Sequence, residues 1–170
     1  DHGDELEAGG GRVDVLRAGL KAELARQEKL LKSSGVLLGY RYEGSPICVA
    51  DGTPEPPDHP QQYVPVARPG HRAPHAWLAD GRSVLDVLGP GFTLLCFDGV
   101  NACARAFESA CAQQGVPLKL VPIDAPAIRQ LYGERACVLV RPDLMVAWRG
   151  DTVADAQAAG DHFGKTCRAQ

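Results

Sequence analysis

The sequence lacks any apolar run that approaches the length of a membrane span, and its charges nearly balance. A transmembrane helix needs about 20 consecutive apolar residues. The formal net charge of −3 shows no excess of basic residues such as binding to nucleic acid or to an anionic membrane surface requires. We therefore expect a globular protein with no membrane partner and no nucleic-acid partner.

A paired cysteine motif is also absent, although the chain has six cysteines. None of them forms a Cys-x-x-Cys pair, the commonest spacing of zinc and dithiol sites. Cys96 and Cys137 lie in the apolar, strand-like runs "FTLLCF" and "ACVLV", and Cys103 and Cys111 lie in a helix-like stretch. We expect free thiols that pack as small hydrophobic side chains in a reducing cytoplasm. A disulfide or a reactive thiol stays open as the alternative.

The third absence is a dinucleotide-binding loop, which needs three glycines around a tight turn. The stretch "GPGFTL" supplies Gly89 and Gly91 but has Leu94 in the third place. The stretch "GDHFG" at 160–164 falls in an expected helix with no strand before it. We therefore expect no catalytic residue and no FAD bound by this chain itself.

Two histidines four residues apart, His71 and His75, raise the question of a metal site. Zinc takes three or four ligands, and His59 is the only further histidine nearby. We therefore expect no metal here. The stretch "RPGHRAPH" predicts a rigid loop in which Arg72 and His75 hydrogen-bond backbone carbonyls.

Proline divides the chain into three parts. Seven of the thirteen prolines fall in residues 53–74, which predicts an ordered, extended connector. Before it, residues 1–52 contain a predicted long helix over 12–32 and a predicted strand over 36–42. After it, residues 75–170 form the most regular part. The long helix carries one apolar stripe: Val13, Leu16, Leu20, Leu24 and Leu31.

Residues 75–170 predict the element order β-α-β-α-β-α-β-β-α, an α/β fold with helices on both faces of a central sheet. Strands are expected over 76–81, 92–97, 118–123 and in a hairpin over 136–148, with Trp77 and Trp148 in the core. Helices are expected within 83–89 and over 101–114, 125–132 and 153–168. This order resembles the thioredoxin-like one. Asp98-Gly99 occupies the turn where a redox-active member has its dithiol, so we expect no thiol catalysis.

Four stretches carry a more specific resemblance: "LLGYRYEGSPICVADGTPEPP", "YVPVARPGHRAPHAWLADG", "LGPGFTLL" and "VLVRPDLMVAWRG". Together they resemble the C-terminal region of single-component FAD-dependent aromatic hydroxylases, which include phenol hydroxylase, 3-(3-hydroxyphenyl)propionate hydroxylase and polyketide-tailoring hydroxylases. The resemblance covers about residues 12–168. It implies a thioredoxin-like accessory domain without a dithiol, preceded by the tail of a catalytic body in residues 1–52. The parent enzyme would use FAD, NAD(P)H and oxygen, and its FAD and substrate domains would be the partners of this chain.

The long helix bears on the interface that this resemblance implies. An isolated helix of this length is marginal in water, so its leucine stripe needs a partner. In the chain alone, the helix would fold back on its own domain or pair with a second copy, and the connector favours pairing in a homodimer. The expected interface residues are Leu16, Leu20, Leu24, Tyr40, Tyr42, Arg72 and His75.

Two other functions remain open on the residues alone. One is a stand-alone thioredoxin- or peroxiredoxin-like enzyme with a single reactive cysteine, and the other is a free-standing binding module. The chain begins without methionine and shows no signal peptide. We therefore expect a piece of a longer cytoplasmic protein.

Overall fold

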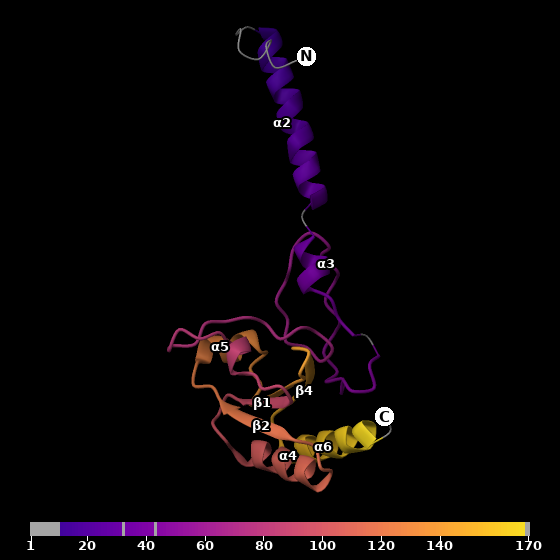
Figure 1. The fold of residues 1–170 in the computed structure, drawn as a ribbon, viewed down its shortest axis with the longest axis vertical. Coiled ribbons are helices and arrows are strands. Elements are labelled where there is room, and N and C mark those ends of the chain that lie inside the picture. Colours follow the sequence, from indigo (N-terminus) through magenta and orange to yellow (C-terminus); the bar gives the residue numbers. More distant parts are fainter. Residues whose placement is uncertain (1–10, 32, 43, 169–170) are drawn as a thin grey trace.

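A long helix stands away from an α/β body in the computed structural model of the chain (Figure 1). The structure describes residues 11–31, 33–42 and 44–168, without the side chains of residues 11–12, 28–31 and 167–168. Helix α2 spans Gly11–Leu31 and the short helix α3 spans Ser34–Leu38. The predicted long helix is thus confirmed, whereas the side chain of Leu31 lies outside the description. Among the described helices, none has the length and apolarity to cross a bilayer.

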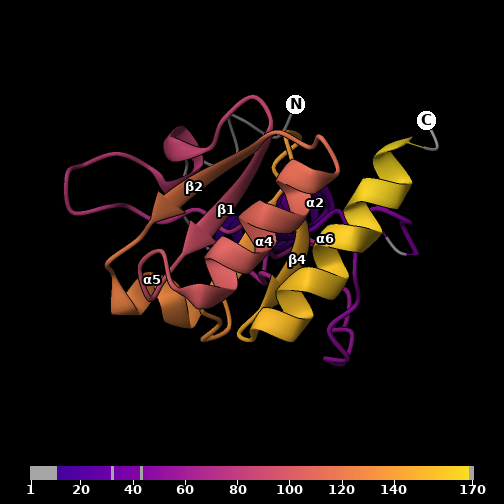
Figure 2. The ribbon, with the colours of Figure 1, turned by 90° about the horizontal axis from the view of Figure 1, so that it is seen from below.

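A four-stranded sheet with the order β2-β1-β3-β4 forms the centre of the body. Strand β1 (Phe92–Cys96) pairs in parallel with β2 (Leu118–Pro122) and antiparallel with β3 (Cys137–Val140), which pairs antiparallel with β4 (Val146–Gly150). Helix α4 (Ala102–Gln113) connects the two parallel strands, and α5 (Pro126–Leu131) follows β2. Helix α6 (Val153–Arg168) follows β4 and packs beside α4 (Figure 2). The predicted thioredoxin-like sheet is confirmed.

Alternate strand residues fill two cores on opposite faces of the sheet, because successive side chains of a strand point to opposite sides. Leu94 and Leu139 face α4 and α6, where Phe107 and Phe163 complete one core. On the other face, buried residues of β1, β3 and β4 pack with α5 and with the 3-10 helix η1 (Val84–Val87). Helices therefore cover both faces, as the element order predicts.

The outer edge of β4 is covered by chain from the proline-rich part. The amide of Val49 donates to the carbonyl of Ala147 at 2.8 Å, and Gly70 donates to the carbonyl of Val146 at 2.8 Å. The amide of Val146 returns a bond to the carbonyl of His71, also at 2.8 Å. These bonds satisfy an edge that would otherwise attract another strand. They fix Val49, before the connector, and Gly70 and His71, within it, to the body.

The predicted strand over 36–42 is wrong in its first half. Residues Ser34–Leu38 form α3, in which Leu37 donates to the carbonyl of Ser33 at 3.0 Å. Only Arg41 forms a β-bridge, to His71. A short apolar run such as "VLL" fits a helix as well as a strand. The outer edge of β4 is occupied by Val49 and Gly70.

The predicted strand over 76–81 is reduced to one β-bridge, between Trp77 and Ser83. Gly81, at φ 85°, closes a tight turn between its two sides. Leu78 packs against the core, which turns Trp77 outward because neighbouring residues point to opposite sides. Trp77 is 68% exposed, so its predicted place in the core is wrong, whereas Trp148 is buried as predicted.

Candidate interdomain surface

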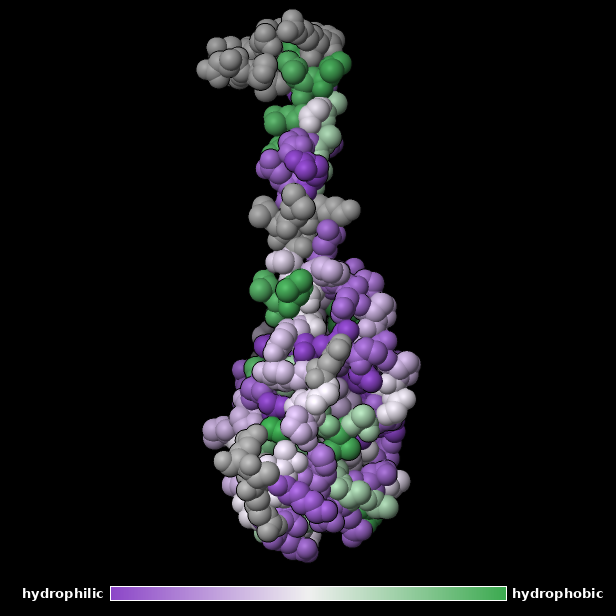
Figure 3. All heavy atoms as spheres, turned by 90° about the vertical axis from the view of Figure 1, so that its right-hand side faces the viewer, coloured by the Kyte–Doolittle hydropathy of each residue, from purple (hydrophilic) through white to green (hydrophobic). Residues whose placement is uncertain are grey.

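Helices α2 and α3 expose several apolar side chains to solvent. Leu20 and Leu24 are 50% and 57% exposed, and Leu37 of α3 is 72% exposed. Figure 1 shows α2 extending away from the sheet, so the helix is not folded back on its own domain. Hydrophobic atoms recur along this projection in Figure 3. We call these exposed side chains together the outer apolar face: Leu20, Leu24, Val36, Leu37, Leu38 and Tyr40.

An aromatic pair joins α3 to the sheet. The rings of Tyr40 and Tyr42 meet edge to face with centroids 5.0 Å apart. The guanidinium of Arg141, from the β3–β4 hairpin, lies 5.1 Å from the centroid of the Tyr42 ring. A cation at this distance over an aromatic face is attracted to it. The outer apolar face is therefore continuous with the body at this point.

The carboxylate of Glu55 in the connector is shared by three basic side chains. Its Oε1 lies 3.1 Å from Arg41 Nε and 3.0 Å from His71 Nε2. Its Oε2 pairs with Arg68. The side chain of His71 is only 9% exposed. One carboxylate thus holds together the chain after α3, the connector and the loop along β4.

Burial governs the protonation of His71. Desolvation lowers the pKa of its imidazole, and the charges of Arg41 and Arg68 lower this pKa further. The hydrogen bond to Glu55 acts in the opposite direction but does not outweigh them. The folded pKa therefore lies below the unfolded one, so the unfolded chain takes up the proton first as pH falls. The contribution of His71 to stability is present above about pH 6.5 and declines below it.

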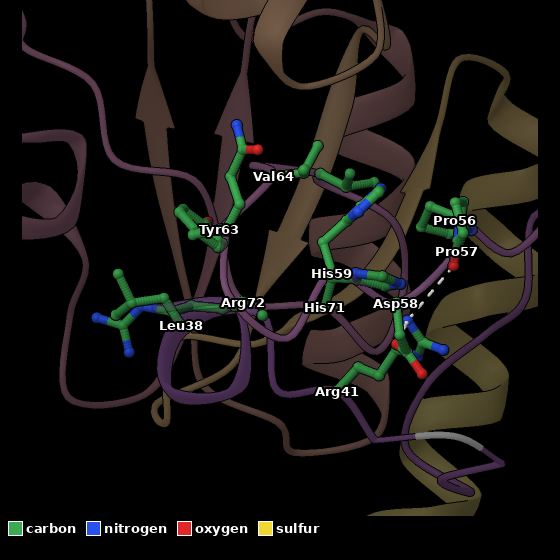
Figure 4. Close-up of a pocket in the computed structure, with 14 residues that line it drawn as sticks. Leu38, Arg41, Pro56, Pro57, Asp58, His59, Tyr63, Val64, His71 and Arg72 are labelled. Carbon is green, nitrogen blue, oxygen red and sulfur yellow. Dashed lines mark hydrogen bonds and ion pairs between the residues drawn. The ribbon is translucent and has the colours of Figure 1, made fainter. Parts of the chain in front are cut away.

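A small cavity of about 120 Å³ lies between α3 and the connector. Figure 4 shows Arg41 at its wall beside Pro56 and Asp58, with Arg72 and Leu38 together at another part of the wall. Arg41 Nη1 lies 2.8 Å from a carboxylate oxygen of Asp58 and 3.5 Å from the carbonyl of Pro56. The cavity walls are thus held by ion pairs within the chain. Over the described ranges, no group of three His, Cys, Asp or Glu side chains could hold a metal ion.

A second ion pair, Asp51 with Arg149, anchors the chain just before the connector to β4. The two side chains are 6% and 8% exposed, and the Nε of Arg149 donates to Asp51. Thr53 donates its hydroxyl to Asp51 at 2.5 Å and accepts from Arg149 Nη2 at 3.1 Å. Gly133 lies directly against this guanidinium, since a Cβ there would be 2.5 Å from Nη1. The pair is therefore buried, hydrogen-bonded and tightly enclosed.

The predicted interface residues fall into separate regions. Leu20, Leu24 and Tyr40 belong to the outer apolar face, with Leu16 partly covered on the same helix and Tyr42 against Tyr40. Their role at an interface stays a prediction.

Arg72 lines the cavity, whereas His75 lies elsewhere, exposed and edge-on to Trp77 at 4.7 Å. The carbonyl contacts expected of Arg72 and His75 are made instead by Arg41, to Pro56, and by Arg68, to Thr53 at 3.0 Å. The latter two arginines lie closer to the connector carbonyls.

Glu55, Asp51 and Arg149 have no counterpart among the predicted residues. Charges isolated in a proline-rich stretch have no periodic pattern that reveals their partners. A signal was present only at Asp51, because Asp-Gly-Thr favours a turn in which the aspartate accepts from the amide two residues later. Thr53 N donates to Asp51 in this way at 3.0 Å.

Residues 66–166 match the family described as "Aromatic-ring hydroxylase, C-terminal". The chain is 37% identical to the FAD-dependent monooxygenase apdD of Emericella nidulans, over 91% of this chain and 28% of that protein. It is 32% identical to phenol 2-monooxygenase of a Pseudomonas species, over 84% of this chain and 26% of that protein. The structure of the flavin-dependent monooxygenase PieE in complex with FAD and substrate matches with a TM-score of 0.76 and 33% identity, over 98% of this chain and 32% of that one. The chain therefore spans less than a third of the length of each of these proteins.

Proposed function

From the premise that the chain belongs to the family of aromatic-ring hydroxylase C-terminal domains, we propose that it is the non-catalytic accessory domain of a larger FAD-dependent monooxygenase. That enzyme hydroxylates an aromatic substrate with NAD(P)H and oxygen, and its flavin and substrate domains carry the reaction. The names and cofactors of the relatives support this proposal. We further propose that the enzyme is cytoplasmic, because Cys48, Cys96, Cys103 and Cys137 are free thiols.

The outer apolar face carries the accessory role. Full burial of a leucine contributes about 1.5–3 kcal/mol, and Leu20, Leu24 and Leu37 each leave at least half of their surface exposed. Exposed apolar side chains that gather on one projection of a molecule favour an interaction site. We propose that the flavin-bearing body covers it in the intact enzyme, and that a second copy covers it in the isolated chain.

The three-part division agrees with this role. In the proposal, residues 1–52 are the tail of the catalytic body, residues 53–74 are the connector, and residues 75–170 are the accessory domain. The ion pair of Asp51 with Arg149 holds the end of the first part against the accessory domain, and Glu55 of the connector pairs with Arg41 of the first part. The chain between α3 and the accessory domain is therefore held in place by ion pairs at both ends.

The alternative of a peroxiredoxin-like enzyme with one reactive cysteine is disfavoured by burial. Repeated turnover of peroxide needs a thiol that is partly exposed in the folded chain and lies in an electropositive setting. Cys96, Cys103 and Cys137 are at most 3% exposed. Asp98-Gly99 occupies the turn after β1, and Gly99 has φ 66°. The free-standing binding module is disfavoured by the family match over residues 66–166.

Replacing Leu20 and Leu24 together by Asp should convert the isolated chain from a dimer to a monomer. Two carboxylates in the pairing surface would have to be desolvated without partners. Light scattering measures the mass, and Val153→Asp is the matched control because Val153 is also an exposed apolar helix residue, on α6. The control should remain dimeric. A wild-type chain that is monomeric at high concentration contradicts the pairing.

A further inference from the structure

Three buried thiols gather at one end of the sheet, beneath the beginning of α4. Cys96 is the last residue of β1, Cys137 is the first residue of β3, and Cys103 is the second residue of α4. All three belong to the same core cluster, and their exposed fractions are 0%, 0% and 3%. Other small apolar side chains could fill this part of the core equally well. The presence of three thiols together therefore suggests a chemical role.

The strand register places Cys96 and Cys137 directly opposite each other. The amide of Phe97 donates to the carbonyl of Ala136 at 2.8 Å, which makes that neighbouring pair a hydrogen-bonded one. Because such pairs alternate along an antiparallel ladder, Cys96 and Cys137 form a non-hydrogen-bonded pair, with Cα atoms typically about 4.5 Å apart. Disulfides span Cα separations of about 4.4–6.8 Å. A bond between these two sulfurs therefore requires little backbone movement.

Cys137 is the shared neighbour of the other two thiols. The interaction of Cys137 with these two thiols lowers the pKa of Cys96 and Cys103 and raises that of Cys137. Its sulfur also lies 3.9 Å from the side-chain oxygen of Asn101, the N-cap of α4. Cys103 Sγ donates to the carbonyl of Thr152 at 3.3 Å. The helix N-terminus adds a field that favours a thiolate at Cys103.

We propose that Cys96, Cys103 and Cys137 form a peroxide-oxidisable thiol cluster in which Cys137 closes an intramolecular disulfide with one of its two neighbours. The bond would fasten β3 to β1 or to α4, at the end of the sheet where α4 begins. The strand ends and the first helical turn open more readily than the middle of an element, which gives a molecule as small as hydrogen peroxide access.

The reaction balances with hydrogen peroxide as the only co-reactant. A neighbouring thiol, Cys103 or Cys96, loses its proton, and the thiolate attacks one peroxide oxygen. The O–O bond breaks, leaving a sulfenic acid and a hydroxide that takes the proton to form water. The Cys137 sulfur then attacks the sulfenic sulfur, the S–O bond breaks, and hydroxide leaves with the Cys137 proton as a second water. Two thiols are oxidised to one disulfide and one peroxide is reduced to two waters.

The test uses the full chain with Cys48 and Cys167 replaced by serine, which leaves four of the six cysteines. The protein is treated with hydrogen peroxide while folded, then unfolded in urea with an alkylating reagent and weighed by mass spectrometry. We expect two alkylated thiols instead of four, and a peptide cross-linked through Cys137. Four alkylated thiols, or a cross-link that leaves out Cys137, would overturn the proposal.

Single variants in this background sharpen the result. Cys137→Ser should abolish the cross-link and leave the thiol that peroxide attacks as a sulfenic acid or a higher oxide, because the Cys137 sulfur is no longer there to displace the oxygen. Cys111→Ser is the matched control, because Cys111 is equally buried but lies near the other end of α4. It should still form the disulfide. Thermal unfolding of each reduced variant identifies any that does not fold, and a Cys137→Ala variant repeats the test with a smaller apolar side chain.

Discussion

Replacing Asp51 by Ala should lower the free energy of unfolding by about 3–5 kcal/mol. The substitution leaves the guanidinium of Arg149, 8% exposed, without its carboxylate partner inside a closed site. The hydroxyl of Thr53 remains as one acceptor at 3.1 Å, but it carries no charge. Urea unfolding followed by circular dichroism measures the loss. Removing both charges, with Asp51→Leu and Arg149→Met, should recover much of it.

The matched control is Asp80→Ala, which breaks an ion pair with Arg82 on the surface. Those two side chains are 50% and 62% exposed, so the loss should stay below about 1 kcal/mol. Equal losses for Asp51→Ala and Asp80→Ala would contradict the role assigned to the buried pair.

The loss at Asp51 should also depend on pH. Burial opposes ionisation, but hydrogen bonds from Thr53 and Arg149 outweigh it and lower the pKa of Asp51 below its usual value. Because the unfolded chain then binds the proton first, the stability that Asp51 contributes is complete above about pH 4 and declines as pH falls further. The difference between wild type and Asp51→Ala should therefore shrink in acid.

Replacing Phe107 by Ala should cost about 3–5 kcal/mol of unfolding free energy, because it opens a cavity in the core between the sheet and α4. The ring is fully buried and stacks on Trp148 with centroids 5.0 Å apart. It also lies 6.0 Å from the ring of Phe163 in α6. The same unfolding measurement applies. The substitution also removes the ring contact between α4 and α6 that Phe107 makes with Phe163.

Phe92→Ala is the matched control for this prediction. Phe92 is only partly buried at the rim of the same core, 6.1 Å from Phe163. The space left by its ring opens to water, so the loss should be less than half of that for Phe107→Ala. A larger effect at Phe92 would show that the centre of the core lies elsewhere.

The elements of the accessory domain could be predicted from local patterns. Strand β1 is an apolar run bounded by glycine and Asp-Gly, and α4 begins at the N-cap Asn101, whose side chain accepts from Ala104 N at 3.0 Å. Each of these signals lies within a few residues of the element that it defines. The order of such elements then restricts the sheet to few arrangements.

Long-range contacts could not be predicted in the same way. Asp51 and Arg149 are almost a hundred residues apart, and nothing in either neighbourhood indicates the other. The orientation of Trp77 depends on whether Trp77 or its neighbour Leu78 faces the core. Val49 and Gly70 occupy the outer edge of β4, and the residues predicted as a strand form α3 instead. Each outcome is decided by competition for the same edge or core, which only the folded chain reveals.

Photocrosslinking in the intact enzyme tests most directly whether the outer apolar face docks this domain on a flavin-bearing body. A photoreactive amino acid replaces Leu24, which is 57% exposed in the chain alone, and in a second variant replaces Val153 on α6, which is 41% exposed. Mass spectrometry identifies the linked peptides. We predict that position 24 crosslinks to the flavin-bearing part of the same polypeptide and that position 153 does not. The proposed docking is contradicted if position 24 crosslinks to the flavin-bearing part no more often than position 153 does.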